Sequence, residues 1–287
     1  MSDWKAIRDA RSDITDYVIH LTRRIVDVHH GTGYNLPFYQ AGFARLKAIV
    51  KSGFLVPTKA ARVTFRNIRT HVIKGKYPAV CFSEMPLDQI MPTLHHVGGT
   101  SYQGYGIALH KVDLYNYGGR PVIYGDNSLH AALPSELEYL FMRYDPRKPG
   151  QPGYPYDFTF EREWRTKLTA NLLPWRHTLK GVPLLLPDDF NSVAIETNTN
   201  QWLYRKNAPD VRLIVARNED VAPLRQWLNG WKPAEKMGAY FKIYYYAIRK
   251  AQIISLEYVK ERLEAGDQDY RKIDILPTPK EMPDVAS

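Results

Sequence analysis

The chain has 287 residues and a formal net charge of +9, from 39 Lys and Arg against 30 Asp and Glu. Its 44% apolar and 24% charged residues are the usual balance of a globular domain, which excludes a collagen, a coiled coil or a mostly disordered chain. No run approaches the ~18 apolar residues of a membrane span, and the charged N-terminus is unlike a secretory signal. Because the one cysteine, Cys81, cannot form an internal disulfide, we expect a cytoplasmic protein. A single cysteine also excludes metal sites built on several thiolates, and we expect no metal and no membrane partner.

Positive charge is concentrated in one stretch of the sequence. No acidic residue lies between Asp27 and Glu84, whereas nine Lys and Arg do. A field of this sign attracts phosphate-rich partners, and the many Trp and Tyr side chains can stack on unpaired bases. The sequence therefore predicts that DNA or RNA binds through residues 45–76. The alternative is a solvated basic face balanced by acids from other segments.

The expected elements mix short strands with helices. Apolar residues spaced three and four apart predict a helix over 4–24, followed by a strand over 25–28. The later expected elements are a helix 42–52 ended by Gly53, strands 79–82, 106–110 and 121–124, a helix 133–144, a loop or linker 145–157, strands 158–165 and 211–216, and helices 219–231 and 252–265. Because this order has no regular βαβ alternation, it favours an α+β fold.

The first candidate motif is His30-Gly31-Thr32, at the end of the expected strand 25–28. A histidine beside a glycine turn can bring an imidazole and backbone groups against a ligand. With helix 42–52 and Gly53-Phe54 after it, the motif resembles the ADP-ribosyltransferases, in which a strand ends in His-Gly-Thr or His-x-Thr before such a helix. Poly(ADP-ribose) polymerases and DarT-type DNA-modifying toxins share it. The resemblance implies that His30, Gly31 and Thr32 hold NAD; a surface turn is the alternative.

The second motif is Ala79-Val-Cys-Phe-Ser-Glu-Met-Pro-Leu87. It resembles the strand that lines the nicotinamide pocket in the same family, which implies Ser83 as a polar wall residue. The tyrosine that stacks on nicotinamide is then Tyr102 or Tyr105, between which the sequence does not decide. An arginine beyond the first helix contacts the pyrophosphate in DarT-type enzymes, and Arg66 is the candidate beside Arg62. An ordinary core strand is the alternative.

The third motif is Glu161-Arg-Glu163-Trp-Arg165. Two glutamates at i and i+2 of a strand share one face, about 7 Å apart. One carboxylate can stabilise an oxocarbenium-like transition state while the other acts on the acceptor, as in glycoside chemistry. The pair resembles the catalytic strand of the ADP-ribosyltransferases, which implies that Glu163 contacts the ribose and Glu161 is the auxiliary acid. Salt bridges with the arginines are the alternative.

Other chemistries are less consistent with the sequence. Cys81 lies at an apolar strand position that suits an inert thiol, and no zinc or Walker motif is present. A looser resemblance links the chain to bacterial abortive phage-infection proteins, which implies a toxin-like or antiphage role and a possible antitoxin.

We therefore expect an ADP-ribosyltransferase-like split β-sheet core with flanking helices. Residues 1–175 would form the catalytic core, including the N-terminal helix, and residues 176–287 would continue the same domain. The expected activity is NAD-dependent modification of a nucleic acid. Two alternatives are a non-enzymatic nucleic-acid- or partner-binding protein and a metal-dependent nuclease that uses Glu161, Glu163 and Asp157.

Overall fold

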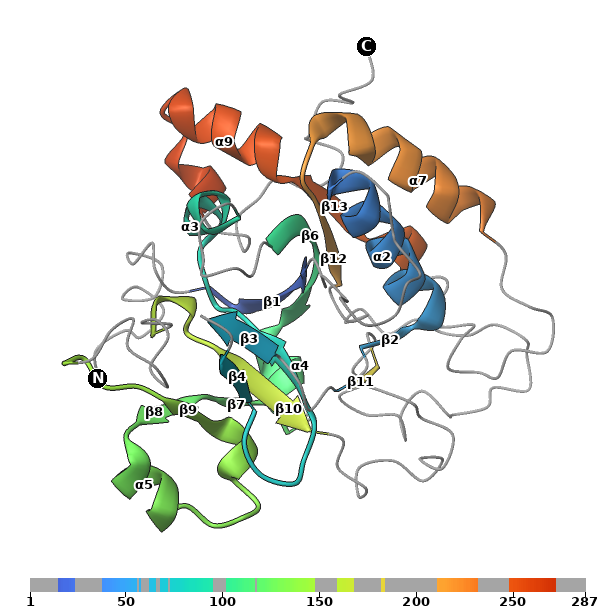
Figure 1. Ribbon diagram of the computed structural model, residues 1–287. Coiled ribbons are helices and arrows are strands. Elements are labelled where there is room, and N and C mark those ends of the chain that lie inside the picture. The colour runs from blue at the N-terminus through green and yellow to red at the C-terminus, as the bar shows by residue number, and fades with distance from the viewer. Residues whose placement is uncertain are drawn as a thin grey trace, which may run out of the picture.

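The computed structural model has an α+β fold built around two antiparallel-rich sheets (Figure 1). It describes residues 15–23, 38–55, 57, 62–65, 68–71, 73–94, 102–116, 118–147, 159–167, 182–183, 211–231 and 248–271. The fold is given below for these residues.

The larger sheet has the strand order β1-β6-β12-β13. Strand β6 (Tyr102–His110) pairs antiparallel with β1 (Tyr17–Arg23) and β12 (Arg212–Val215), and β12 pairs parallel with β13 (Gln252–Ser255). Helices α2 (Phe38–Ser52) and α7 (Val221–Gly230) cover one face of this sheet. Helices α3 (Leu87–Thr93) and α9 (Leu256–Glu264) cover the other (Figure 1).

The two-residue period of the strands divides the core between these faces. Leu213 and Val215 of β12 pack with α2 and α7, whereas Ile214 packs with α3 and α9. All three side chains are fully buried. The sheet is therefore covered on both faces, which is why its strands read as continuous apolar runs.

The smaller sheet has the order β5-β10-β7, with both pairs antiparallel. Its strands are β5 (Ala79–Phe82), β10 (Trp164–Lys167) and β7 (Arg120–Pro121). Phe82 and Trp164 oppose each other in the ladder, and both belong to the apolar cluster that includes α2 and α7. The smaller sheet thus shares a core with the larger one.

Short elements complete the described structure. Three two-stranded pairs are β2 (Phe54–Leu55) with β11 (Val182–Pro183), β3 (Arg62–Phe65) with β4 (Ile68–His71), and β8 (Ile123–Gly125) with β9 (Phe141–Arg143). The remaining helices are α4 (Lys111–Asn116), α5 (Asn127–Ala132) and the 3-10 turns η1 (Glu138–Leu140), η2 (Thr159–Glu161), η4 (Asn218–Asp220) and η5 (Gln268–Arg271). None of the helices in the described ranges is long and apolar enough to cross a membrane.

Several sequence predictions are confirmed. Helix 42–52 lies within α2, and Gly53 ends it with a φ of 72°, donating its N–H to the Ile49 carbonyl. The strands expected at 79–82, 106–110 and 211–216 correspond to β5, β6 and β12, and helix 219–231 corresponds to α7. The α+β class is confirmed as well.

Other predictions are wrong. The described part of the helix expected over 4–24 is a strand from Tyr17 to Arg23, where the β-branched Val18 and Ile19 are held by pairing with β6; residues 4–14 lie outside the described residues. The helix expected over 252–265 begins as strand β13 and becomes helical at Leu256. The helix 133–144 contains η1 and β9, and the strand 121–124 is divided between β7 and β8. Strand 25–28 and most of loop 145–157 lie outside the described residues.

Candidate functional site

The site lies where the two sheets meet. Strand β1 touches the end of β5 through Ile19 and Ser83, each of which donates its N–H to the other's carbonyl, at 2.7 and 2.8 Å. The Ser83 hydroxyl in turn donates to the carbonyl of Glu161, at 2.8 Å. Three segments far apart in sequence, the histidine-bearing β1, the serine strand β5 and the glutamate turn before β10, therefore meet at Ser83.

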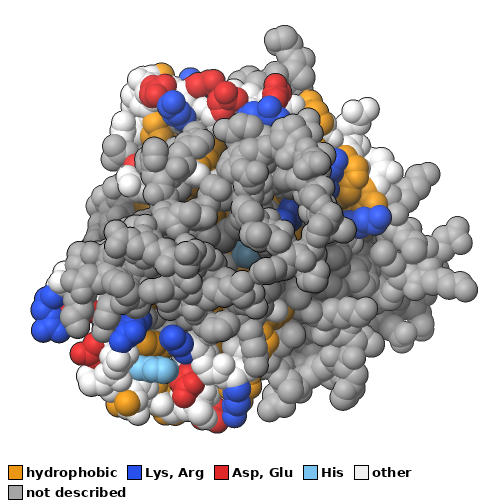
Figure 2. Space-filling view, viewed as in Figure 1, with side chains coloured by type: hydrophobic (Ala, Val, Ile, Leu, Met, Phe, Trp, Pro, Cys, Tyr) orange, Lys and Arg blue, Asp and Glu red, His pale blue; other side chains and the backbone are white. Residues whose placement is uncertain are grey.

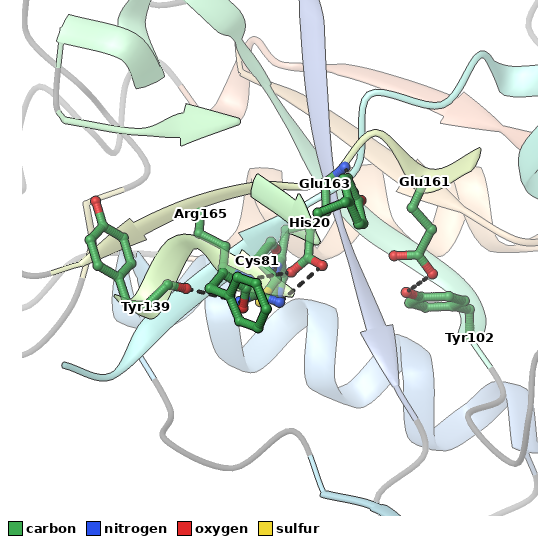
Figure 3. A network of polar contacts seen from close by, with 9 residues as sticks. His20, Cys81, Tyr102, Tyr139, Glu161, Glu163 and Arg165 are labelled. Atoms are coloured by element: carbon green, nitrogen blue, oxygen red, sulfur yellow. Dashed lines mark hydrogen bonds and ion pairs between the residues drawn. The ribbon is translucent and has the colours of Figure 1, made fainter. Parts of the chain in front are cut away.

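The two candidate glutamates do not share one strand. Glu161 ends the 3-10 turn η2, and β10 begins only at Trp164. Arg162 between them has a φ of 46°, the left-handed region that non-glycine residues seldom adopt. This turn directs the glutamates to different partners, with Glu161 beside Tyr102 at one end of the network and Glu163 toward Arg165 (Figure 3). The prediction that both carboxylates face the same way is therefore wrong.

Glu161 is buried against a neutral partner. Its carboxylate accepts a hydrogen bond of 2.9 Å from the hydroxyl of Tyr102, and both residues are about 5% exposed or less. Tyr102 stands at the start of β6, where the register with β1 shifts between Leu21 and Arg23. Gly104, with a φ of 74°, bends β6 beside this shift. Such irregularities re-aim side chains, and here the bend accompanies a tyrosine directed at the glutamate.

Glu163 forms a buried ion pair with Arg165 (Figure 3). Arg165 donates Nε to one carboxylate oxygen at 2.8 Å and Nη2 to the other at 3.2 Å. Its Nη1 donates to the carbonyls of Tyr139 and Phe141, at 2.8 and 3.0 Å. Burial would lower the pKa of Arg165, but the charge of Glu163 and its hydrogen bonds outweigh that effect and raise it above the ordinary value. The guanidinium thus fixes the carboxylate in one orientation.

A third buried carboxylate, Glu84, braces the same turn. One oxygen accepts from Lys111 at 2.7 Å and lies 3.3 Å from Nη2 of Arg162. The other accepts from the indole nitrogen of Trp164 at 2.8 Å. Glu84 therefore ties α4, the left-handed residue and β10 together. Sequence analysis quoted Glu84 within its motif but gave it no role.

His20 is a candidate that sequence analysis missed. It lies on β1, is half-buried, and packs edge to face against Phe82 with ring centroids 5.9 Å apart. Its Nδ1 atom is 2.9 Å from the carbonyl of Cys81, and because a carbonyl only accepts, Nδ1 carries the proton. His20-Leu21-Thr22 has the form His-x-Thr. The run Tyr17-Val-Ile-His-Leu-Thr was a strand signal, hidden by the helical spacing of the residues before it.

Thr22 offers a polar atom beside this histidine. As residues i and i+2 of one strand, His20 and Thr22 share a face. Thr22 is 2% exposed, and its hydroxyl has no hydrogen-bond partner among the described residues. Buried polar atoms are nearly always paired, so an unpaired hydroxyl at this seam is a position that a ligand group could fill.

The structure separates the two candidate tyrosines. Tyr105 is fully buried, packs on Phe43 of α2, and donates to a carboxylate oxygen of Asp220 at 2.6 Å. Burial first, and then the hydrogen bond to Asp220, raise the pKa of Tyr105. Tyr102 instead reaches Glu161. Of the two, the structure brings Tyr102 to the candidate site and Tyr105 to the core.

Several predicted site residues cannot be placed. His30, Gly31, Thr32 and Arg66 lie outside the described residues, as does Asp157. Cys81 is half-buried, and its histidine contact is made through the carbonyl oxygen. Among the described residues, no three His, Cys, Asp or Glu side chains are grouped so as to hold a metal ion.

The basic stretch 45–76 is distributed over two places. Its described side chains are Arg45, Lys47 and Lys51 on α2, and Lys74 and Lys76 in the segment before β5. Lys47 covers the ring of Phe43 at 4.6 Å. On the face shown in Figure 2, the described Lys and Arg side chains are interspersed with Asp and Glu rather than gathered into one field. Nucleic-acid binding through this stretch stays a prediction.

Comparison with known proteins adds no family. No family model, no curated protein and no solved structure matches this chain. The functional argument therefore rests on the residues and their geometry.

Proposed function

We propose that this chain is an NAD-dependent ADP-ribosyltransferase that modifies a nucleic acid. The observation that carries the proposal is the pair of contacts at Ser83, which joins β1 through Ile19 and the glutamate turn through the carbonyl of Glu161. In the family, a histidine strand, a serine strand and a glutamate strand follow one another in sequence. The segments of this chain that we match to them lie next to one another in space. His20-Leu21-Thr22 on β1 takes the His-x-Thr role at this seam, and His30-Gly31-Thr32 remains the alternative.

The chemistry assigns a task to each group. Glu163 stabilises the positive charge that develops on the ribose as nicotinamide leaves, because a carboxylate held by Arg165 is oriented in advance. A carboxylate has about four acceptor positions, so the two bonds from Arg165 do not saturate it for a ribose hydroxyl. The Thr22 hydroxyl supplies a hydrogen bond to the bound dinucleotide. Glu161, bonded to Tyr102, is the auxiliary acid.

The test is transfer of label from NAD. Purified protein is incubated with NAD labelled in its adenylate part and, separately, with single-stranded DNA, RNA or a protein pool. We expect nicotinamide release and label on a nucleic acid. Nicotinamide release with label on the protein pool alone would overturn the nucleic-acid acceptor. No nicotinamide release with any pool would favour the non-enzymatic alternative, and chelator-sensitive cleavage without NAD would favour the nuclease.

A matched pair of variants then tests the site. Tyr102→Phe removes only the hydroxyl that donates to Glu161. Tyr270→Phe removes the hydroxyl of an equally buried tyrosine in η5, at 6% exposure against 5%. We expect Tyr102→Phe to lower the turnover by roughly tenfold or more, the scale of one positioned catalytic hydrogen bond, and Tyr270→Phe to leave it unchanged. Equal turnover in the two variants would remove Glu161 from the proposed site.

The toxin-like or antiphage role and an antitoxin partner rest on the resemblance alone. They stay predictions beside this proposal.

A further inference from the structure

A row of alternating cations and tyrosine rings lies at one end of the smaller sheet. Its members are Lys76, Tyr77, Lys167, Tyr139, Arg120 and Tyr115, and we call them the cation–tyrosine row. Of these six residues, only Lys76 belongs to the basic stretch 45–76. Tyr139 also touches the candidate site, since its carbonyl accepts a hydrogen bond from Arg165.

The contacts at one end of the row involve two lysines. The ammonium of Lys167 lies 4.0 Å from the centroid of the Tyr77 ring and 4.9 Å from that of Tyr139. Lys76 lies 5.0 Å from the same Tyr77 ring. The two rings meet edge to face, with centroids 6.5 Å apart. Cations so placed over aromatic rings are held in position yet keep their charge.

Arg120 forms the other end of the row. Arg120 lies opposite Arg165 in the ladder of β7 and β10, so its side chain is on the same face of the smaller sheet as those of Arg165 and Lys167. Arg165 in turn donates to the carbonyl of Tyr139. The guanidinium of Arg120 lies 3.9 Å from the centroid of Tyr115 and donates to the carbonyls of Tyr115 and Gly119. Tyr115 is 50% exposed, which is unusual for a large aromatic side chain. Arg120 therefore holds an exposed tyrosine ring in one orientation.

Positive charge exceeds negative charge along the row. Among the described residues, the three cations of the row lie near Glu136, 3.6 Å from Lys76, and Glu138, whose side chain lies beside Gly75. The Lys76–Glu136 pair is 59% exposed on both sides, and such surface pairs contribute little and yield to competing anions. The row can thus exchange a weak intramolecular partner for phosphate.

We infer that the cation–tyrosine row is a docking surface for single-stranded nucleic acid, with phosphates on Lys76, Lys167 and Arg120 and an unpaired base on Tyr115. Cationic grooves with aromatic platforms are the common means of binding single strands without sequence preference. Lys167 ends β10, and Glu163 directly precedes this strand, so the two residues are about 13 Å apart at the rise of a strand. A single-stranded nucleic acid bound on the row therefore passes within a few nucleotides of the candidate site.

This inference names the acceptor's docking face and to that extent rests on the proposed function, but binding is measured without NAD. Fluorescent oligonucleotides of roughly 12 nucleotides, as single-stranded DNA, single-stranded RNA and duplex DNA, are titrated with the full chain over roughly 50 to 300 mM salt. We expect both single strands to bind more tightly than the duplex. Three phosphate contacts predict a slope of about −2 for log affinity against log salt, at roughly 0.7 for each contact.

The variants remove charge or stacking separately. Lys76→Gln with Arg120→Gln should reduce the slope to about −0.7. The matched control, Lys250→Gln with Lys260→Gln, removes the same charge from exposed positions elsewhere and should keep the slope. Tyr115→Leu keeps an apolar side chain but should weaken binding by roughly 5- to 100-fold if a base stacks there. Thermal melts establish that each variant is folded.

The inference is overturned by no binding of either single strand at low salt, or by equal slopes and affinities in the row variants and the control. Preference for the duplex would also contradict it. If single strands bind through the row but no nicotinamide is released, the proposed enzyme fails and the docking surface stands. If nicotinamide is released but no oligonucleotide binds, the docking surface fails and the proposed enzyme stands.

Discussion

Replacing Glu163 by Gln tests the buried ion pair as well as the chemistry. Gln keeps the size of the side chain and one acceptor oxygen, but it removes the charge that Arg165 was buried against. Arg165 has no exposed surface, so its guanidinium cannot reach water after the change. Breaking one side of a buried pair costs about 3–5 kcal/mol, and because one acceptor remains we expect the lower end, about 3 kcal/mol.

The measurement is chemical denaturation. We expect the midpoint to fall to a lower denaturant concentration, while the slope of the unfolding free energy against denaturant concentration stays unchanged. A loss of about 3 kcal/mol corresponds to a fall of roughly 5 °C in the melting temperature of a chain this size. The control is Glu264→Gln, the same substitution in an exposed pair with Lys260 at 3.7 Å, which should cost about 0.5 kcal/mol or less. Since the pKa of Arg165 is raised, its contribution is fully present below the ordinary arginine pKa, and the cost of Glu163→Gln should be the same at neutral and mildly alkaline pH.

A double-mutant cycle with Arg165→Met isolates the interaction. Each single variant leaves an unpaired buried charge, and the double variant leaves neither, so we expect a coupling energy of about 1.5–3 kcal/mol. A cost for Glu163→Gln no larger than that for Glu264→Gln, or a coupling near zero, would refute the reasoning. It also follows that lost activity in Glu163→Gln is evidence for catalysis only in samples shown to be folded.

Two further outcomes follow from the core. Gly42→Ala places a Cβ 2.4 Å from the ring of Tyr105 and should cost about 1–3 kcal/mol in denaturation, whereas Gly230→Ala meets nothing within 4 Å at the end of α7 and should be neutral or stabilising by up to about 1 kcal/mol. Because the pKa of Tyr105 is raised in the folded state, its contribution is present below about pH 10 and is lost as pH rises above it. Above that pH, the unfolding free energy of Tyr105→Phe should thus fall less steeply with pH than that of the unsubstituted protein, by up to about 1.4 kcal/mol per pH unit. Equal pH slopes in the two proteins would contradict this assignment.

The sequence alone determined the elements whose local pattern agreed with their surroundings. Helix α2 has an apolar face at Leu46 and Val50 and a glycine that ends it, and β5 and β12 are short apolar runs that are buried on both sides. It also predicted Ser83, Glu161 and Glu163 as candidate site residues, with Tyr102 or Tyr105 left undecided, because such residue types point to polar chemistry wherever they lie. The residue types, however, do not indicate in which direction each side chain points.

Tertiary structure decided the directions and the register. The run from Tyr17 to Arg23 is a strand because β6 pairs with it, and this partner, about 80 to 90 residues away in sequence, cannot be predicted from local spacing. The glutamates diverge because Arg162 adopts a left-handed conformation, which the ion pair with Glu84 stabilises. His20 lies at the seam because its neighbour Ile19 pairs with Ser83. Long-range pairing fixes these features, and it becomes visible only when the chain is folded.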